Sequence, residues 1–133
     1  MNRQDICNRA LALVGTRFRI GGRDRASGLD CIGLAAMALG RELPLPSGYR
    51  LQGASADRWH RWFDRHQFIK VKRASEPGDL VLVRAGPVQF HLLIAVPDGF
   101  VHAHAGLRHV VFLPGDPLWP IVSVWRAPFI SGD

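Results

Sequence analysis

Residues 28–39 read Gly-Leu-Asp-Cys-Ile-Gly-Leu-Ala-Ala-Met-Ala-Leu. From Cys31 to Leu39 every residue is small or apolar, with Asp30 before the run and Gly40 after it. Aspartate is a favoured N-cap of a helix, and glycine is favoured just past a helix C-terminus. The stretch therefore predicts a buried helix that begins at Cys31.

Cys31, at the start of that helix, is a candidate nucleophile. Backbone N–H groups and the positive end of the helix dipole favour a thiolate there. The dipole contributes at most ~2 kcal/mol, and the neighbouring Asp30 opposes a negative sulfur, so a cationic partner is needed. The alternative is a small thiol that only packs in the core, and Cys7 keeps that interpretation. Two cysteines do not form a disulfide framework.

A helix is also predicted near the N-terminus. Ile6, Ala10, Leu11 and Val14 recur at helical spacing, which indicates one buried side. Gly15 stands where a C-terminal cap is expected.

A third helix is predicted over residues 54–67, after Pro44 and Pro46 break the chain. Its large aromatic residues fall on one side, which favours packing against a core. Tryptophans can also stack on sugars, but burial is the more common role of large aromatics. The tryptophans of the chain are Trp59, Trp62, Trp119 and Trp125.

From Phe68 onward the sequence is typical of β-structure, because short runs of Val, Ile, Leu and Phe are separated by Gly and Pro. Helices first and a meandering sheet afterwards, with no internal linker, predict one α+β domain over residues 1–133. We expect N-terminal helices packed on a C-terminal antiparallel β-sheet. The predicted strands are residues 68–72, 79–84, 89–95, 100–104, 110–113 and 121–126.

The turn at residues 96–99 sets the register of the central hairpin. A tight two-residue loop asks Pro97 for a backbone N–H that proline lacks. A four-residue loop, built as a type I turn, instead places Pro97 and Gly99 at positions where both are favoured. In that register Ala95 lies opposite Phe100.

Three histidines of the two hairpin strands are candidate partners for Cys31. The four-residue loop makes His91 and His102 diagonal neighbours on one face, within side-chain reach. With a two-residue loop, His104 becomes the diagonal neighbour of His91 instead. A three-residue loop moves His102 and His104 to the opposite face. We favour His102 as the partner of His91.

A helix-start cysteine that faces a histidine, which a second polar residue orients, is the arrangement of a thiol hydrolase. The imidazole of His91 takes the thiol proton and later protonates the leaving amine. Backbone N–H groups at the helix start, including that of Cys31, are candidates to receive the oxyanion. No motif points to a cofactor, and none is predicted.

These residues resemble the NlpC-type family of papain-like cell-wall cysteine peptidases. The order and approximate spacing of five motifs agree with that family over about residues 5–126, and the compact chain looks like the phage-associated branch. The matching motifs are Phe18-Arg19-Ile20-Gly21-Gly22, residues 28–34, Pro77-Gly78-Asp79-Leu80-Val81, His91-Leu92-Leu93-Ile94 and Gly99-Phe100-Val101-His102-Ala103.

The resemblance implies a papain-like fold and a substrate class. Family members cleave amide bonds in peptidoglycan stem peptides, typically between D-glutamate and the following diamino acid. By position, Cys31 is the nucleophile, His91 the base and His102 the third member. Asp30 would face the substrate amine in relatives that need a free N-terminus, although simple helix capping is an equal alternative. His104 is a further candidate for substrate contact.

The sequence departs from the family pattern in three places, and the first two concern substrate preference. Phe18 stands where the family usually has tyrosine, so a hydroxyl near the thiol is missing. Ile32 stands where serine usually follows the nucleophile, and the hairpin is about one residue shorter. The changes at Phe18 and Ile32 remove polar contacts and weigh against recognition of a free amine.

Two other interpretations compete with a hydrolase. Cys31, His91, His102 and His104 could together bind zinc, but no short Cys-x-x-Cys or His-Glu-x-x-His spacing supports a metal site. A non-catalytic wall-binding or tail-structural module on the same fold is the second.

The bulk composition limits partners and location. With 47% hydrophobic and 21% charged residues the chain is typical of a globular protein, and no apolar run is long enough for a membrane helix. The net charge of +6 favours polyanions such as wall polymers, but no basic block indicates specific nucleic-acid binding. Without a signal-peptide pattern, we expect synthesis in the cytoplasm. Delivery to the wall would then come from a phage tail, with tail proteins as partners, or from lysis.

Overall fold

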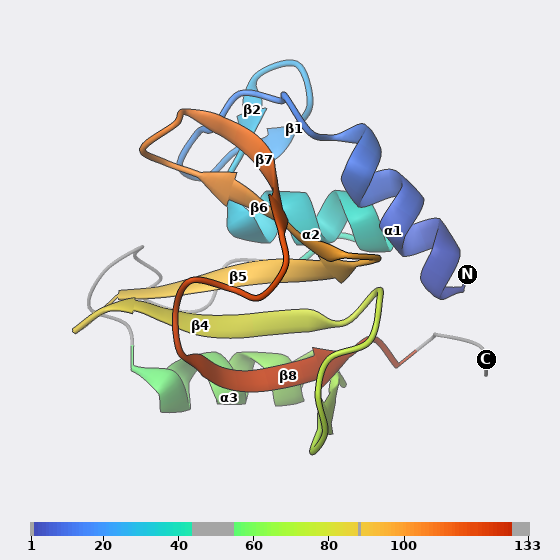
Figure 1. The fold of residues 1–133 in the computed structure, drawn as a ribbon, viewed down its shortest axis with the longest axis vertical. Coiled ribbons are helices and arrows are strands. Elements are labelled where there is room, and N and C mark those ends of the chain that lie inside the picture. Colours follow the sequence, from blue (N-terminus) through green and yellow to red (C-terminus); the bar gives the residue numbers. More distant parts are fainter. Residues whose placement is uncertain (1, 44–54, 88, 129–133) are drawn as a thin grey trace.

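The structure is a computed structural model that describes residues 2–43, 55–87 and 89–128 (Figure 1). Helices α1 and α2 precede most of the sheet, and α3 lies along strand β8. None of the described helices is long and apolar enough to span a membrane. The elements are α1 (Arg3–Ala12), β1 (Arg23–Asp24), β2 (Gly28–Leu29), α2 (Cys31–Leu39), α3 (Ala56–Arg65), β3 (Ile69–Val71), β4 (Leu80–Gly86), β5 (Gln89–Val96), β6 (Gly99–His104), β7 (His109–Pro114) and β8 (Ile121–Arg126).

Helix α2 has the bounds and caps predicted from the sequence. The side chain of Asp30 accepts a hydrogen bond from the backbone N–H of Gly33 at 2.8 Å. At the other end, Gly40 adopts a left-handed conformation with φ of 67°. All residues of α2 except Met37 are buried, so this helix is held on every side by the rest of the molecule.

Helix α1 differs in detail from the predicted helix. Leu11 and Val14 are each 41% exposed, and the helix ends at Ala12 with Leu13 as its C-cap rather than near Gly15. The sequence prediction placed all four apolar residues on one buried side, but only Ile6 and Ala10 face the core. Val14 lies beyond the helix end. The residues that α1 and its cap bury are Ile6, Cys7, Ala10 and Leu13.

The six-stranded sheet has the order β3-β8-β4-β5-β6-β7, and all its neighbouring strands are antiparallel. The predicted strands match β3 to β8 within about two residues at each end. The expected simple meander is wrong at one place, because β8 returns to lie between β3 and β4. The break predicted at Pro44 and Pro46 falls outside the described residues.

The three helices contribute to one main core against the sheet. Trp59, Trp62 and Phe63 of α3 join the buried residues of α1 and α2 in this core. The ring of Phe63 stacks on Trp125 of β8 with centroids 4.6 Å apart. A second, smaller buried cluster is formed by residues of strands β4, β5, β6 and β8. It contains Val81, Val83, Leu93, Ala95, Phe100 and Val124.

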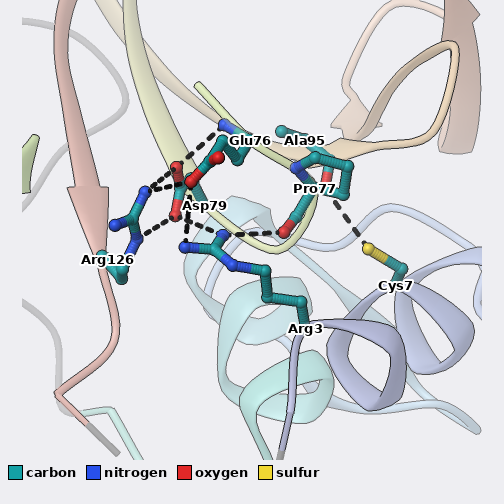
Figure 2. Close-up of polar contacts among 7 residues, drawn as sticks. All are labelled: Arg3, Cys7, Glu76, Pro77, Asp79, Ala95 and Arg126. Atoms are coloured by element: carbon teal, nitrogen blue, oxygen red, sulfur yellow. Dashed lines mark hydrogen bonds and ion pairs between the residues drawn. The ribbon is translucent and has the colours of Figure 1, made fainter. Parts of the chain in front are cut away.

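An ion-pair network joins the start of α1 to the edge of β4 and the end of β8 (Figure 2). The fully buried carboxylate of Asp79 accepts hydrogen bonds from Arg3 at 3.1 Å and from Arg126 at 3.0 and 3.1 Å. Both arginines also pair with Glu76, and Arg3 donates to the carbonyl of Pro77. This network fixes helix α1 to the sheet.

Cys7 lies beside this network and packs in the core. Its thiol donates a hydrogen bond to the carbonyl of Ala95 at 3.7 Å (Figure 2). Burial is the main cause that raises the pKa of the Cys7 thiol above its ordinary value. A thiol that stays protonated and buried is a structural residue.

The central hairpin has the predicted register. Ala95 pairs with Phe100, and Val96 pairs with Gly99. Asp98 has a positive φ of 68°, which is typical of the third position of a type II turn, so the predicted type I turn is wrong. Aspartate tolerates this conformation better than most residues.

Candidate active site

His91 on β5 and His102 on β6 are joined side chain to side chain. The Nε2 atom of His91 and the Nδ1 atom of His102 are 2.9 Å apart, a hydrogen-bond distance. Cross-strand pairing between β5 and β6 extends from Val96–Gly99 only as far as Ile94–Val101, and both histidines lie beyond this last pair. The two rings therefore meet where the regular ladder has ended.

His104 lies next to this pair, with its ring centroid 5.4 Å from that of His102. Its Nδ1 atom accepts a hydrogen bond from the backbone N–H of Leu107 at 3.0 Å. A nitrogen that accepts cannot carry the proton, so a neutral His104 has its proton on Nε2. His91 contacts His102 rather than His104, in agreement with the register that the sequence favoured.

Trp119, in the segment between β7 and β8, covers the histidine pair. Its ring meets those of His91 and His102 edge to face, with centroids 5.9 and 5.6 Å apart. From the sequence alone, this residue was expected only to pack in the core or to stack on sugars. Its place beside the histidines depends on the path of a Pro-flanked loop, which no spacing in the sequence indicates.

A cavity of about 150 Å³ opens beside the three histidines. Among the predicted site residues, Phe18, His91, His102 and His104 line it. The other lining residues are Ala85, Gln89, Phe90, Ala103, Ala105, Gly106 and Trp119.

Cys31, Asp30 and Ile32 do not belong to this described lining. They are buried, with exposed fractions of 1%, 0% and 0%, and Cys31 and Ile32 pack in the main core. The structure thus gathers four of the seven predicted residues around one cavity and places the other three at the start of α2. Their catalytic and substrate-binding roles stay predictions.

The segment around Phe18 connects the cavity to the start of α2. Phe18 forms a parallel β-bridge with Leu29, two residues before Cys31. Its backbone N–H donates to the carbonyl of Arg108, in the turn after β6. Helix α2 itself packs against β5 and β6, the strands that carry the histidines. The elements that carry the predicted nucleophile and base are therefore direct neighbours.

Both oxygens of the Asp30 carboxylate accept hydrogen bonds from other residues of the protein. One oxygen accepts from the N–H of Gly33 and from Arg23 Nη1, both at 2.8 Å, and the other accepts from the N–H of Gly21 at 2.8 Å. Arg23 was not predicted from the sequence. The structure thus gives Asp30 a capping role and an ion pair.

The pKa values of the two bonded histidines are strongly lowered. Burial, followed by the positive charges that His102 and His104 would carry, lowers the pKa of His91 to about 3. Burial and the charge of His104 lower the pKa of His102 to about 4. Both rings are therefore neutral at pH 7, and a neutral ring has one nitrogen able to accept a proton.

Within the described residues, no group of three or more His, Cys, Asp or Glu side chains is arranged to hold a metal ion.

The sequence matches no family model and no curated protein. Several solved structures are similar to the fold. NlpC2 of Trichomonas vaginalis has a TM-score of 0.68 and 17% identity, over 95% of this chain and 46% of that protein. The NlpC/p60 domain of the peptidoglycan hydrolase SagA has a TM-score of 0.59 and 24% identity, over 86% of this chain and 90% of that domain's chain. The peptidoglycan hydrolase RipB of Mycobacterium tuberculosis has a TM-score of 0.61 and 20% identity, over 94% of this chain and 64% of that protein.

The fold is that of an NlpC/p60 domain. The predicted papain-like α+β class, with N-terminal helices on an antiparallel sheet, is confirmed. The chain spans less than half of the T. vaginalis proteins, 44% of NlpC1 and 46% of NlpC2. Because a fold can carry many functions, activity has to be argued from the site.

Proposed function

We propose that this chain is a cysteine peptidase that hydrolyses amide bonds in peptidoglycan stem peptides. Cys31 is the nucleophile, His91 the base and His102 the residue that orients the base. The observation that carries the proposal is the 2.9 Å hydrogen bond between His91 and His102. This bond lies beside a cavity, on strands against which the Cys31 helix packs.

The hydrogen bond leaves a defined role for each nitrogen of His91. Its Nε2 atom is engaged with His102, so Nδ1 is the atom that takes the proton from the Cys31 sulfur. This requires the tautomer in which His91 donates through Nε2–H and His102 accepts through Nδ1. His102 thereby holds both the ring angle and the proton position of the base, which is the function of a third triad member.

The reaction then proceeds in two halves. The thiol proton moves to His91, and the resulting thiolate–imidazolium pair attacks the carbonyl carbon, forming a carbon–sulfur bond. The negative oxygen is stabilised by the positive end of the α2 dipole at Cys31. The carbon–nitrogen bond breaks as His91 gives its proton to the leaving amine. Water, deprotonated by His91, then releases the acyl group and restores the thiol.

The lowered pKa of His91 suits its role as proton donor better than its role as proton acceptor. A base with a pKa of about 3 is a reluctant acceptor but a strong acid once protonated, so it transfers the proton readily to the leaving amine. A thiolate close to the ring would stabilise the imidazolium and offset part of this depression. We therefore propose a resting site with a neutral thiol and a neutral imidazole.

The substrate class rests on the family resemblance and on the similar structures. SagA and RipB are described as peptidoglycan hydrolases, and both share this fold. The net charge of +6 favours approach to anionic wall polymers. Association with a phage tail, and delivery to the wall by a tail or by lysis, stay predictions from the sequence.

Digestion of purified peptidoglycan tests the proposal. We expect new amine and carboxyl ends, identified by mass spectrometry, with wild type and with the control variant Cys7→Ala. With Cys31→Ala, the rate at which new ends appear should fall by at least about 10³-fold. Thiol alkylation should abolish activity while a chelator should not. Activity that survives Cys31→Ala, or is lost only with the chelator, contradicts the mechanism.

A non-catalytic wall-binding module is the second candidate, and one observation favours it. The Cys31 side chain is only 1% exposed and does not line the described cavity, so a substrate has no open path to the sulfur in this structure. This candidate predicts that wild type and Cys31→Ala bind wall fragments equally and that neither cleaves them. Sedimentation of peptidoglycan with the protein, followed by analysis of the soluble fraction, separates the two functions.

A further inference from the structure

The histidine pair lies on the face of the sheet that carries the second, smaller buried cluster. His91 is opposite Val83 of β4, a member of that cluster, and alternate residues of a strand share a face. On β5, His91 therefore shares its face with Leu93, and on β6, His102 shares its face with Phe100. The two imidazoles thus extend the smaller cluster toward the cavity.

The backbones at the two histidines are held from outside the pair. Strand β5 is paired with β4 at His91, and β6 is paired with β7 at His102. The pairing between β5 and β6 themselves ends at Ile94–Val101. That ladder therefore does not set the angle between the two rings. Their 2.9 Å contact depends on what packs around them.

Trp119 supplies that packing. Its ring lies at 81° to the ring of His91 and at 87° to that of His102, and the two imidazoles lie at 80° to each other. Aromatic rings favour such edge-to-face contacts when their centroids are roughly 4.5–7 Å apart. The indole also packs against the smaller buried cluster. Neither imidazole can turn without displacing the indole or losing an edge-to-face contact.

The segment that carries Trp119 is fixed at both ends. The N–H of Gly115 donates to the carbonyl of Asp98 at 2.9 Å, and the carbonyl of Pro120 accepts from the N–H of Arg84 at 3.0 Å. Proline at position 120 also restricts the backbone directly after Trp119. The segment runs from β7 to β8 across the middle of the sheet (Figure 1). The indole is therefore held over the histidines by an anchored connection.

We propose that Trp119 is a positioning residue, which clamps the bonded His91–His102 pair in the orientation and the dry surroundings that proton transfer from Cys31 requires. This role rests on the proposed function. A fixed His91 ring keeps its Nε2–H on His102 and leaves Nδ1 for the thiol proton. The indole also keeps out water, which would compete for both nitrogens.

Nitrogen-15 NMR of the histidine rings tests the clamp without a substrate. In wild type we expect His91 and His102 to be neutral between pH 7 and 5, each with its proton on Nε2 alone. Trp119→Ala should give mixed tautomers in both rings and raise their protonation midpoints by about one pH unit or more. Trp119→Phe keeps an aromatic ring and should keep the wild-type tautomers. The variants His91→Gln and His102→Gln assign the signals.

Leu118→Ala is the matched control, because Leu118 precedes Trp119 in the same segment and is 75% exposed. Its histidine signals should equal those of wild type. If circular dichroism shows that Trp119→Ala does not fold, Trp119→Leu takes its place with the same expectation. A folded variant with wild-type tautomers and midpoints overturns the clamp. The other titratable or charged groups on the elements around the pair are the same in all these variants, and they are Cys31, Arg84, His104, Arg108, His109 and Asp116.

Digestion of purified peptidoglycan connects the clamp to the reaction. The initial rate should fall about tenfold or more in Trp119→Ala, because misplaced reacting groups slow catalysis, and should change less than about threefold in Trp119→Phe and Leu118→Ala. The acid side of the pH–rate profile of Trp119→Ala should move to higher pH, since a histidine with a raised pKa stops accepting protons at a higher pH. A lower rate with unchanged tautomers and pH profile indicates substrate contact and overturns the positioning role. If wild type releases no new ends, the proposed function fails, and the NMR measurement still decides whether Trp119 holds the pair.

Discussion

Lowering the pH should destabilise this protein through His91, and the structure gives the sign and size of the effect. The pKa of His91 is about 3 in the folded chain, against an ordinary value of 6.5. Between about pH 3 and pH 6.5, His91 therefore binds a proton in the unfolded chain but not in the folded chain. The stabilisation is complete above about pH 6.5 and is lost progressively as the pH falls toward 3.

The magnitude follows from the proton-binding difference. One pKa unit corresponds to about 1.4 kcal/mol, so the 1.5 units between pH 6.5 and 5 correspond to about 2 kcal/mol for His91. His102, whose pKa is lowered to about 4, acts in the same direction. Urea unfolding at pH 7 and at pH 5 measures the change in the free energy of unfolding, provided that the m-value stays constant.

Two variants isolate the contribution of His91. His91→Gln keeps a polar side chain beside His102 but does not titrate, so it should lose about 2 kcal/mol less than wild type between pH 7 and 5. His109→Gln, at an exposed position outside the histidine pair, is the matched control. Carboxylates and other groups titrate in all three proteins and cancel in the comparison. Equal losses in wild type and His91→Gln would refute the assignment of a buried, neutral His91.

Three further predictions concern the framework of the site. Gly33→Ala should destabilise by about 1–3 kcal/mol in urea unfolding, because an added Cβ would lie only 2.1 Å from the carbonyl oxygen of Gly22. Asp79→Asn should lower the free energy of unfolding by about 3 kcal/mol, since two arginine charges lose their buried partner. The same change at the exposed Asp116 should have almost no effect in that assay. Cys7→Ala should keep peptidoglycan hydrolysis within about twofold, and a larger loss of activity would contradict its structural role.

Local signals were sufficient for the parts of the fold that depend on short stretches of chain. Asp30 and Gly40 bracket an apolar run, and each cap forms where the sequence predicts it. The register of the hairpin also follows from a local feature, because Pro97 cannot donate a backbone hydrogen bond. That register was enough to choose His102 over His104 as the partner of His91.

Contacts between distant segments could not be predicted in the same way. Leu11 was assigned to the buried side of α1, but an apolar stripe does not say which neighbour will cover it, and the residue is 41% exposed. Arg23 reaches Asp30 only because β1 and β2 fold back as a short hairpin. Trp119 reaches the histidines through a loop whose path depends on the whole sheet. Each of these required tertiary packing that periodicity does not contain.

The site lies where the pairing between β5 and β6 stops. In a continuous antiparallel ladder, diagonal neighbours such as His91 and His102 are about 7 Å apart, a separation that two imidazole side chains can bridge. Pairing ends at Ile94–Val101, so the strands beyond it no longer have to hold that spacing. The Nε2 atom of His91 and the Nδ1 atom of His102 are 2.9 Å apart, and the cavity lies beside them. Because β5 stays paired with β4 at His91 and β6 with β7 at His102, the sheet still holds both histidines while their own strands separate. The interruption of pairing is therefore itself part of the candidate site.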